Sequence, residues 1–133
     1  MRNLNFKSVL WLDDLRSPQI LGIQWVKGYN EFVWHLENKE FPELICFDHD
    51  LAFEHYPVAE NRPGMVIPYG TYKEKTGKEA AEYIVQNNLP LRYWSVHTQN
   101  AQGRINIEKL LRHYCPQGEL RGLQIPYRVL EKS

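Results

Sequence analysis

Two short apolar runs, each stopped by acidic residues, constrain this chain more than any other feature. Residues 8–12 and 44–47 are apolar runs of the length of a single strand. Continuous apolar runs of this kind are typical of strands that are buried on both faces of a parallel sheet. The polar residues that follow the two runs are Asp13-Asp14 and Asp48-His49-Asp50. The sequence therefore predicts two buried strands with charged side chains at their carboxyl ends.

Helical and strand patterns alternate along the rest of the chain. Apolar residues at 29, 32, 33 and 36 follow the spacing of one helix face, and Thr76 with Glu79 forms a capping box at the start of another helix. Further strands are expected at 24–26 and 92–96, a third helix at 103–114 and an edge strand within 120–130. This order predicts one α/β domain, residues 1–133, with a mostly parallel sheet.

The segment between residues 51 and 75 is long and contains three prolines. Loops of this length are uncommon inside a compact domain and are often functional. The alternative is a flap without a role.

The charge distribution limits the possible partners. The net charge is zero, but residues 1–60 hold five basic and ten acidic side chains, and residues 61–133 hold eleven and six. A general nucleic-acid coat and a polybasic membrane anchor are therefore not expected. The uneven halves either build a site for a cation and a phosphate together or simply neutralise each other.

Features of secreted and membrane proteins are missing from the sequence. No run reaches the roughly 18 apolar residues of a membrane span, and the N-terminus does not resemble a signal peptide. Cys46 and Cys115 form no spacing motif. We therefore expect a soluble, cytoplasmic protein.

Three polar segments should meet at one edge of the predicted sheet. Right-handed crossovers place the carboxyl ends of parallel strands together, and ligands of open α/β sheets bind there. The segments are Asp13-Asp14, Asp48-His49-Asp50 and His97-Thr98-Gln99-Asn100. Carboxylates at this density repel one another unless a cation or a proton lies among them. A divalent ion is expected, Mg²⁺ or Mn²⁺ first, with Zn²⁺ or Fe possible because two histidines are near. Taken singly, each segment could also be a solvated turn or a helix cap.

The start of the second helix is a candidate anion site. Thr76 and Lys78 lie where backbone N–H groups are free to bind an anion, although a plain capping box explains the same residues.

These segments resemble the receiver domains of two-component response regulators. Asp13, Asp14 and Asp48 match the aspartates that hold Mg²⁺ and accept a phosphoryl group in those domains. The chain departs from them by adding His49-Asp50 and by lacking a clear lysine after the last strand.

The chain is more similar to a divergent group, the cyclic-phosphate processing receiver domains. Four motifs in order carry this resemblance over about residues 8–110. They are Leu12-Asp13-Asp14-Leu15-Arg16-Ser17-Pro18, Phe47-Asp48-His49-Asp50-Leu51, Lys75-Thr76-Gly77 and His97-Thr98-Gln99-Asn100-Ala101-Gln102-Gly103. Thr98 and Ala101 are mild departures from a usual Ser and Pro. The resemblance implies a receiver-like, flavodoxin-like three-layer sandwich, to which the C-terminal segment adds an edge strand.

The function expected from these residues is metal-dependent hydrolysis of a cyclic phosphate or phosphodiester. The substrate would be a small nucleotide or an RNA end with a 2′,3′-cyclic phosphate rather than long duplex nucleic acid. Asp13, Asp14, Asp48 and Asp50 would hold the ion, and His49 and His97 would act as general acid and base. The expected phosphate or nucleotide contacts are Arg16, Thr76, Lys78, Thr98, Asn100 and Arg104. The alternatives are a phospho-accepting receiver and a module that sequesters a nucleotide without cleaving it.

Overall fold

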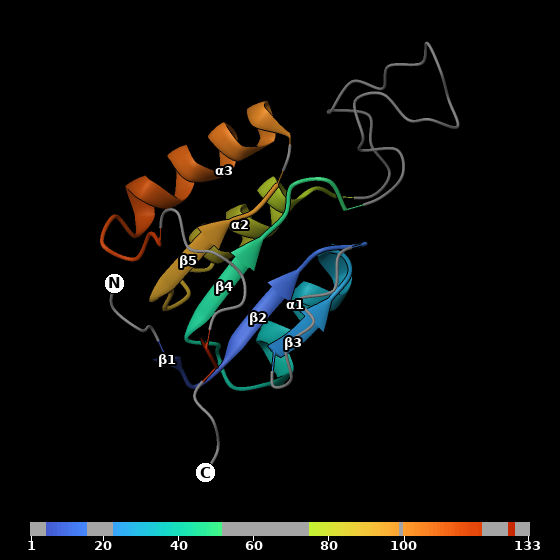
Figure 1. The fold of residues 1–133 in the computed structure, drawn as a ribbon, viewed down its shortest axis with the longest axis vertical. Helices are drawn as coiled ribbons and strands as arrows, with labels where there is room; N and C mark the ends of the chain where they lie inside the picture. Colours follow the sequence, from blue (N-terminus) through green and yellow to red (C-terminus); the bar gives the residue numbers. More distant parts are fainter. Residues whose placement is uncertain (1–4, 16–22, 52–74, 99, 121–127, 130–133) are drawn as a thin grey trace.

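The centre of the molecule is a four-stranded parallel sheet with the strand order β3-β2-β4-β5 (Figure 1). A computed structural model describes residues 5–15, 23–51, 75–98, 100–120 and 128–129. The sheet strands are β2 (Val9–Leu12), β3 (Ile23–Val26), β4 (Leu44–Phe47) and β5 (Tyr93–Val96). The α/β fold with a parallel sheet that the sequence predicts is confirmed.

The register of the strands aligns their carboxyl ends. Leu12 at the end of β2 lies opposite Phe47 of β4, and Phe47 in turn lies opposite Val96 of β5. Because each of these residues is the last of its strand, the residues that follow all emerge at the same edge of the sheet. The three strand ends are thereby brought together, although they are far apart in sequence.

Three helices connect or follow the strands. They are α1 (Tyr29–Asn38), α2 (Gly77–Gln86) and α3 (Ala101–Tyr114). In Figure 1, α1 and α2 lie behind the sheet. Helix α3 lies beside β5 and contacts α2. The first two begin within a residue of their predicted starts, and α3 begins two residues earlier than predicted. Within the described part of the chain, no helix combines the length and apolarity needed to cross a bilayer.

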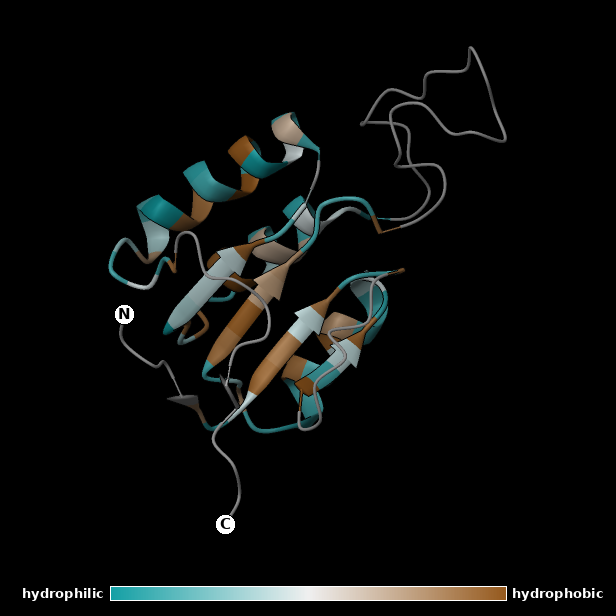
Figure 2. Cartoon of the chain, in the orientation of Figure 1, coloured by the Kyte–Doolittle hydropathy of each residue, from teal (hydrophilic) through white to brown (hydrophobic). Residues whose placement is uncertain are grey.

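Both faces of the central strands are apolar, and each face packs into its own cluster. Strands β2 and β4 are largely brown in Figure 2, the colour of apolar residues. Leu10 and Ile45 point toward the helices, whose inward residues complete the larger cluster: Phe32, Ala80, Ala81, Ile84, Ile107 and Leu111. The opposite face carries Val9, Trp11, Leu44 and Cys46, against which Phe6 and Leu120 pack. In the described residues this second face is therefore covered by strand and loop segments and not by a helix.

The C-terminal strand lies within the predicted residues 120–130 but pairs outside the central sheet. Strand β6 (Arg128–Val129) pairs in parallel with β1 (Asn5–Phe6) in a separate two-stranded sheet. At the edge of the central sheet, the described residues after α3 make one bridge, between Glu119 and Trp94. The strand predicted within 120–130 is therefore present, and its partner is β1 instead of a strand of the central sheet.

Candidate functional site

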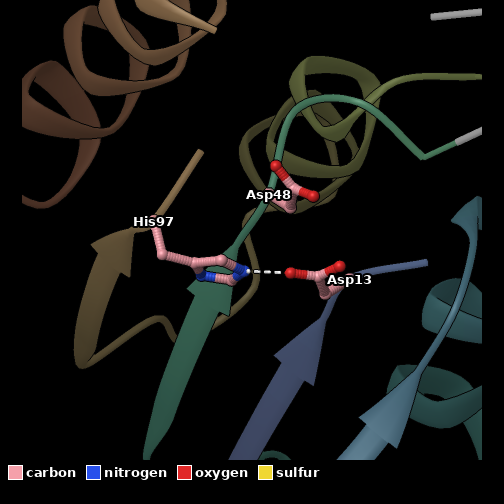
Figure 3. Close-up of side chains that lie close together, drawn as sticks. All are labelled: Asp13, Asp48 and His97. Carbon is pink, nitrogen blue, oxygen red and sulfur yellow. Dashed lines mark hydrogen bonds and ion pairs between the residues drawn. The ribbon is translucent and has the colours of Figure 1, made fainter. Parts of the chain in front are cut away.

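Three side chains converge at the carboxyl ends of the strands. Asp13 follows β2, Asp48 follows β4 and His97 follows β5, and one ligand atom from each lies within 4.8 Å of the other two. Figure 3 shows the His97 side chain reaching across the end of β4 to the carboxylate of Asp13. Two of the expected metal ligands and one of the expected catalytic histidines thus form a single group.

Asp13 is held in place by hydrogen bonds on both carboxylate oxygens. Its Oδ1 accepts from the N–H of Leu15 at 2.9 Å, and its Oδ2 lies 3.1 Å from Nε2 of His97. The backbone is also fixed, because its N–H donates to the carbonyl of Val26 and its carbonyl accepts from the indole of Trp25 at 2.6 Å. Asp13 is fully buried, so its carboxylate is a preorganised acceptor.

Asp48 extends the pairing of β4 by one residue. Its N–H donates to the carbonyl of Leu12 at 3.0 Å, and its Oδ1 accepts from the N–H of His49 at 2.8 Å. Helix α2 begins directly against this residue, since a Cβ atom at Gly77 would overlap the backbone carbonyl of Asp48. Glycine at the first position of α2 is therefore required for the close approach of the helix to the site.

His97 is fixed by both its backbone and its ring. Its N–H donates to the carbonyl of Phe47 at 2.9 Å. Its imidazole stacks on the indole of Trp11, with a centroid separation of 4.0 Å and an angle of 7° between the planes. The side chain is 13% exposed, so solvent reaches it from a limited direction.

The electrostatics of this group suit a positive charge. Asp13 and Asp48 are both buried, and two unit charges at the 4.8 Å limit of the group repel by about 3.5 kcal/mol at an effective dielectric of about 20. A protonated imidazole at His97 or a metal ion would supply the balancing charge. Two carboxylate oxygens and one imidazole nitrogen are suitable donors for a divalent ion, so these residues fit a metal.

Asp50 and His49 belong to a second buried cluster. Nδ1 of His49 lies 2.9 Å from Oδ1 of Asp50, and the same oxygen accepts from Nδ2 of Asn100 at 3.1 Å. Asn100 also caps α3, because its Oδ1 accepts from the N–H of Gly103 at 2.9 Å. The His49 ring packs against Gly103, where a Cβ atom would lie 2.7 Å from Nδ1. This cluster fastens the loop after β4 to the start of α3.

The expected metal ligands are thus divided. Asp13 and Asp48 lie in the group of three, to which neither Asp14 nor Asp50 belongs. His97, which the sequence analysis placed among the acid and base groups, joins the group that could hold an ion.

The start of α2 is occupied by the chain itself. The N–H of Gly77 donates to the carbonyl of His49 at 2.8 Å, and the N–H of Lys78 donates to the hydroxyl of Thr76 at 3.2 Å. Glu79 completes the predicted capping box. Since these donors are already satisfied, the geometry supports the capping interpretation of Thr76 over an anion site.

The remaining expected phosphate contacts lie around α3 or on the surface of α2. Thr98 is buried, and its hydroxyl accepts from the N–H of Asn100 at 3.1 Å. Arg104 donates to the carbonyl of Thr98 at 3.2 Å and keeps 42% of its side chain exposed. Lys78 pairs with Glu82 at 3.7 Å and is 43% exposed. Arg16 lies outside the described residues.

Gly77 and Gly103 lie in the motifs given above, but their packing roles were not predicted from the sequence, and Trp11 was not predicted as part of this region. All three stand within or beside the motifs, but their roles depend on close contacts between separate elements. A signal was available only for Trp11, which alternates with Leu12 along β2 and therefore faces the opposite side of the sheet.

A hollow of about 520 Å³ lies between β3 and α1, and no residue of the group of three lines it. Trp25, Trp34 and His35 are among its lining residues. Burial, together with the positive charge of Lys39, lowers the pKa of His35 from its ordinary value.

Comparisons with known proteins bear on the same segments. A family model described as "Cyclic-phosphate processing Receiver domain" matches residues 8–113. No curated protein gives a significant match. Among solved structures, a fusion protein that contains the trimeric coiled coil of yeast Spc42 is 18% identical, with a TM-score of 0.49 over 89% of this chain and 68% of that chain. Nothing about function follows from a structural likeness at this level.

Proposed function

We propose that this chain, which belongs to the family of cyclic-phosphate processing receiver domains, hydrolyses a cyclic phosphate ester with the help of a divalent metal ion. The observation that carries the proposal is the convergence of Asp13, Asp48 and His97 at one edge of the sheet. Their burial supports the same function, because a divalent ion would offset the repulsion between two enclosed carboxylates.

In this proposal, Asp13, Asp48 and His97 hold the ion. The two carboxylate oxygens favour Mg²⁺ or Mn²⁺, and the histidine nitrogen admits Zn²⁺ or Fe. When bound, the ion would act as a Lewis acid on a phosphoryl oxygen. Asp13 is oriented for this task by the N–H of Leu15, and Asp48 by the N–H of His49.

His49 is the group that we assign to proton transfer. A carboxylate only accepts hydrogen bonds, so the pair with Asp50 places the hydrogen of the neutral imidazole on Nδ1, which is the tautomer that a base acting through Nε2 requires. In the hydrolysis, the oxygen of water bonds to phosphorus and one ring P–O bond breaks. The water loses a proton to the base, the leaving oxygen gains one, and the product is a phosphomonoester.

The substrate we propose is a small nucleotide or an RNA end that carries a cyclic phosphate. Arg104 and Lys78 keep exposed cationic side chains that could contact a phosphate oxygen. The neutral net charge of the chain argues against long duplex nucleic acid as the ligand.

Turnover of defined cyclic phosphates tests the proposal. The protein is incubated with 2′,3′-cyclic and 3′,5′-cyclic nucleotides and with RNA ending in a 2′,3′-cyclic phosphate, in Mn²⁺ and in chelator. We expect a phosphomonoester product in Mn²⁺ from the wild type and from Gln86→Ala, a change at an exposed residue of α2. Asp13→Asn and Asp48→Asn should be inactive. Turnover by Asp48→Asn equal to that of the wild type would remove the metal-site proposal.

A phospho-accepting receiver is the second candidate, because Asp48 ends a central strand beside a second buried aspartate. Incubation with acetyl phosphate followed by mass spectrometry distinguishes the two. A stable acyl phosphate on Asp48 without turnover of any cyclic phosphate would favour the receiver.

A further inference from the structure

We infer that Trp11 is a positioning residue whose indole sets the plane of the His97 imidazole, so that Nε2 faces Asp13 and a bound metal ion. The effect of this orientation on metal binding rests on the proposed function. Its basis is the stacked geometry of the two rings.

The orientation of His97 is not provided by its own strand. β5 and β2 are separated by β4, and adjacent strands lie about 4.8 Å apart, so the gap between their axes is about 10 Å. His97 spans much of this gap by lying across the end of β4 (Figure 3). A side chain that extends sideways from the end of a strand needs a support beneath it to hold one rotamer.

Trp11 provides that support from the same strand as Asp13. The two residues are two positions apart on β2, the spacing at which side chains of a strand share a face. In register with Trp11 stand Cys46 on β4 and Ser95 on β5, both small and buried. The small neighbours leave space on this face for the broad indole beneath the imidazole.

The stack is close and its base is fixed. A centroid separation of 4.0 Å is below the range of about 4.5–7 Å usual for aromatic pairs, and the planes are within 7° of parallel. Trp11 itself is 4% exposed and packs in the cluster with Phe6, Val9 and Leu44. Stacking prevents the imidazole from turning out of this plane, while the 3.1 Å contact with Asp13 fixes its direction within the plane.

Nuclear magnetic resonance of the metal-free protein tests the orientation directly. Long-range ¹H–¹⁵N spectra at pH 8 report which nitrogen of His97 carries the hydrogen, and the ring protons report the indole through its ring current. We expect one tautomer with hydrogen on Nε2 and upfield ring protons in the wild type. Trp11→Phe, which keeps an aromatic surface, should retain the tautomer, and Trp11→Leu should mix the two tautomers.

The matched control is Trp94→Leu, which removes a fully buried indole from the cluster on the opposite face of the sheet. It should unfold at a lower temperature, as Trp11→Leu should, but leave the His97 signals unchanged. If Trp11→Leu does not fold, Trp11→Phe and Trp11→Tyr decide the matter, since both must keep the Nε2 tautomer.

Mn²⁺ binding, followed by electron paramagnetic resonance, measures the consequence. Trp11→Leu should bind about 10- to 100-fold more weakly, the loss typical of residues that orient a metal ligand, and Trp94→Leu should bind like the wild type. A single wild-type tautomer in Trp11→Leu would overturn the inference, as would wild-type Mn²⁺ affinity in that variant. If the wild type binds no Mn²⁺, the proposed metal site fails, whereas the tautomer comparison still decides the role of Trp11.

Discussion

Asparagine at position 48 should make the metal-free protein more stable, although it removes a proposed metal ligand. The carboxylates of Asp13 and Asp48 reach within 4.8 Å of each other, where repulsion is about 3.5 kcal/mol at an effective dielectric of about 20. The adjacent His97 offsets part of this repulsion, so we expect a gain of about 1–2 kcal/mol. The hydrogen bond from the N–H of His49 is kept, because the Oδ1 of asparagine also accepts.

The same substitution two residues away should have the opposite effect. Asp50 is as buried as Asp48, at 5% against 4% exposed. Its carboxylate accepts from Nδ1 of His49 and from Nδ2 of Asn100 on one oxygen. Asp50→Asn loses the charge that strengthens both bonds, and we expect a loss of about 1.5–3 kcal/mol.

Urea unfolding at pH 7.5, followed by circular dichroism, measures both effects in chelator and in Mn²⁺. At 100 times the dissociation constant, Mn²⁺ should stabilise the wild type by about 2.7 kcal/mol and leave Asp48→Asn unchanged. The reasoning is refuted if Asp48→Asn in chelator is destabilised as much as Asp50→Asn. In that case the two carboxylates would not repel each other in the folded state.

Three further changes probe the neighbouring residues. Asp14→Asn should alter Mn²⁺ affinity by less than about threefold, which is under 1 kcal/mol, because Asp14 is outside the group of three. A loss of affinity as large as that of Asp48→Asn would contradict this expectation. Gly103→Ala should lower turnover on the order of 100-fold while keeping Mn²⁺ affinity, because the added Cβ displaces the His49 ring. Unchanged turnover would show that the His49 ring takes no part in the reaction. Because the pKa of His35 is lowered in the folded protein, the unfolded chain binds more protons than the folded one below about pH 6.5. The free energy of unfolding should therefore fall as the pH drops from 7.5 to 5. His35→Gln should show a smaller fall in the same urea titrations, and an identical pH dependence would refute this role of the histidine.

The sequence predicted the fold well where the pattern depends on neighbours along the chain. The apolar run at 44–47 and the capping box at Thr76 give local signals, and both elements are found where expected. The partner of β6 was not predicted, because β1 is only two residues long and carries no periodicity of its own.

The candidate site was predictable in its location but not in its division of roles. The strand ends identify Asp13, Asp48 and His97 as neighbours through topology alone. That His97 reaches Asp13, while Asp50 turns to His49, depends on side-chain direction across strands and on space left by Gly103. Such contacts have no periodic signature in a single sequence.

Among the strands that the structure describes, β5 is the outermost on its side of the central sheet, and His97 follows it. Edge strands open locally at a smaller free energy than global unfolding requires. Each such opening would withdraw the imidazole and leave the two aspartates facing each other. Backbone hydrogen bonds of Trp94 with Gly118 and Leu120, on either side of the bridge at Glu119, tie this edge to the segment after α3. The time for which the group of three stays assembled therefore depends on these contacts of β5 with the segment after α3. The amide exchange rates of β5 residues should report how often the group comes apart.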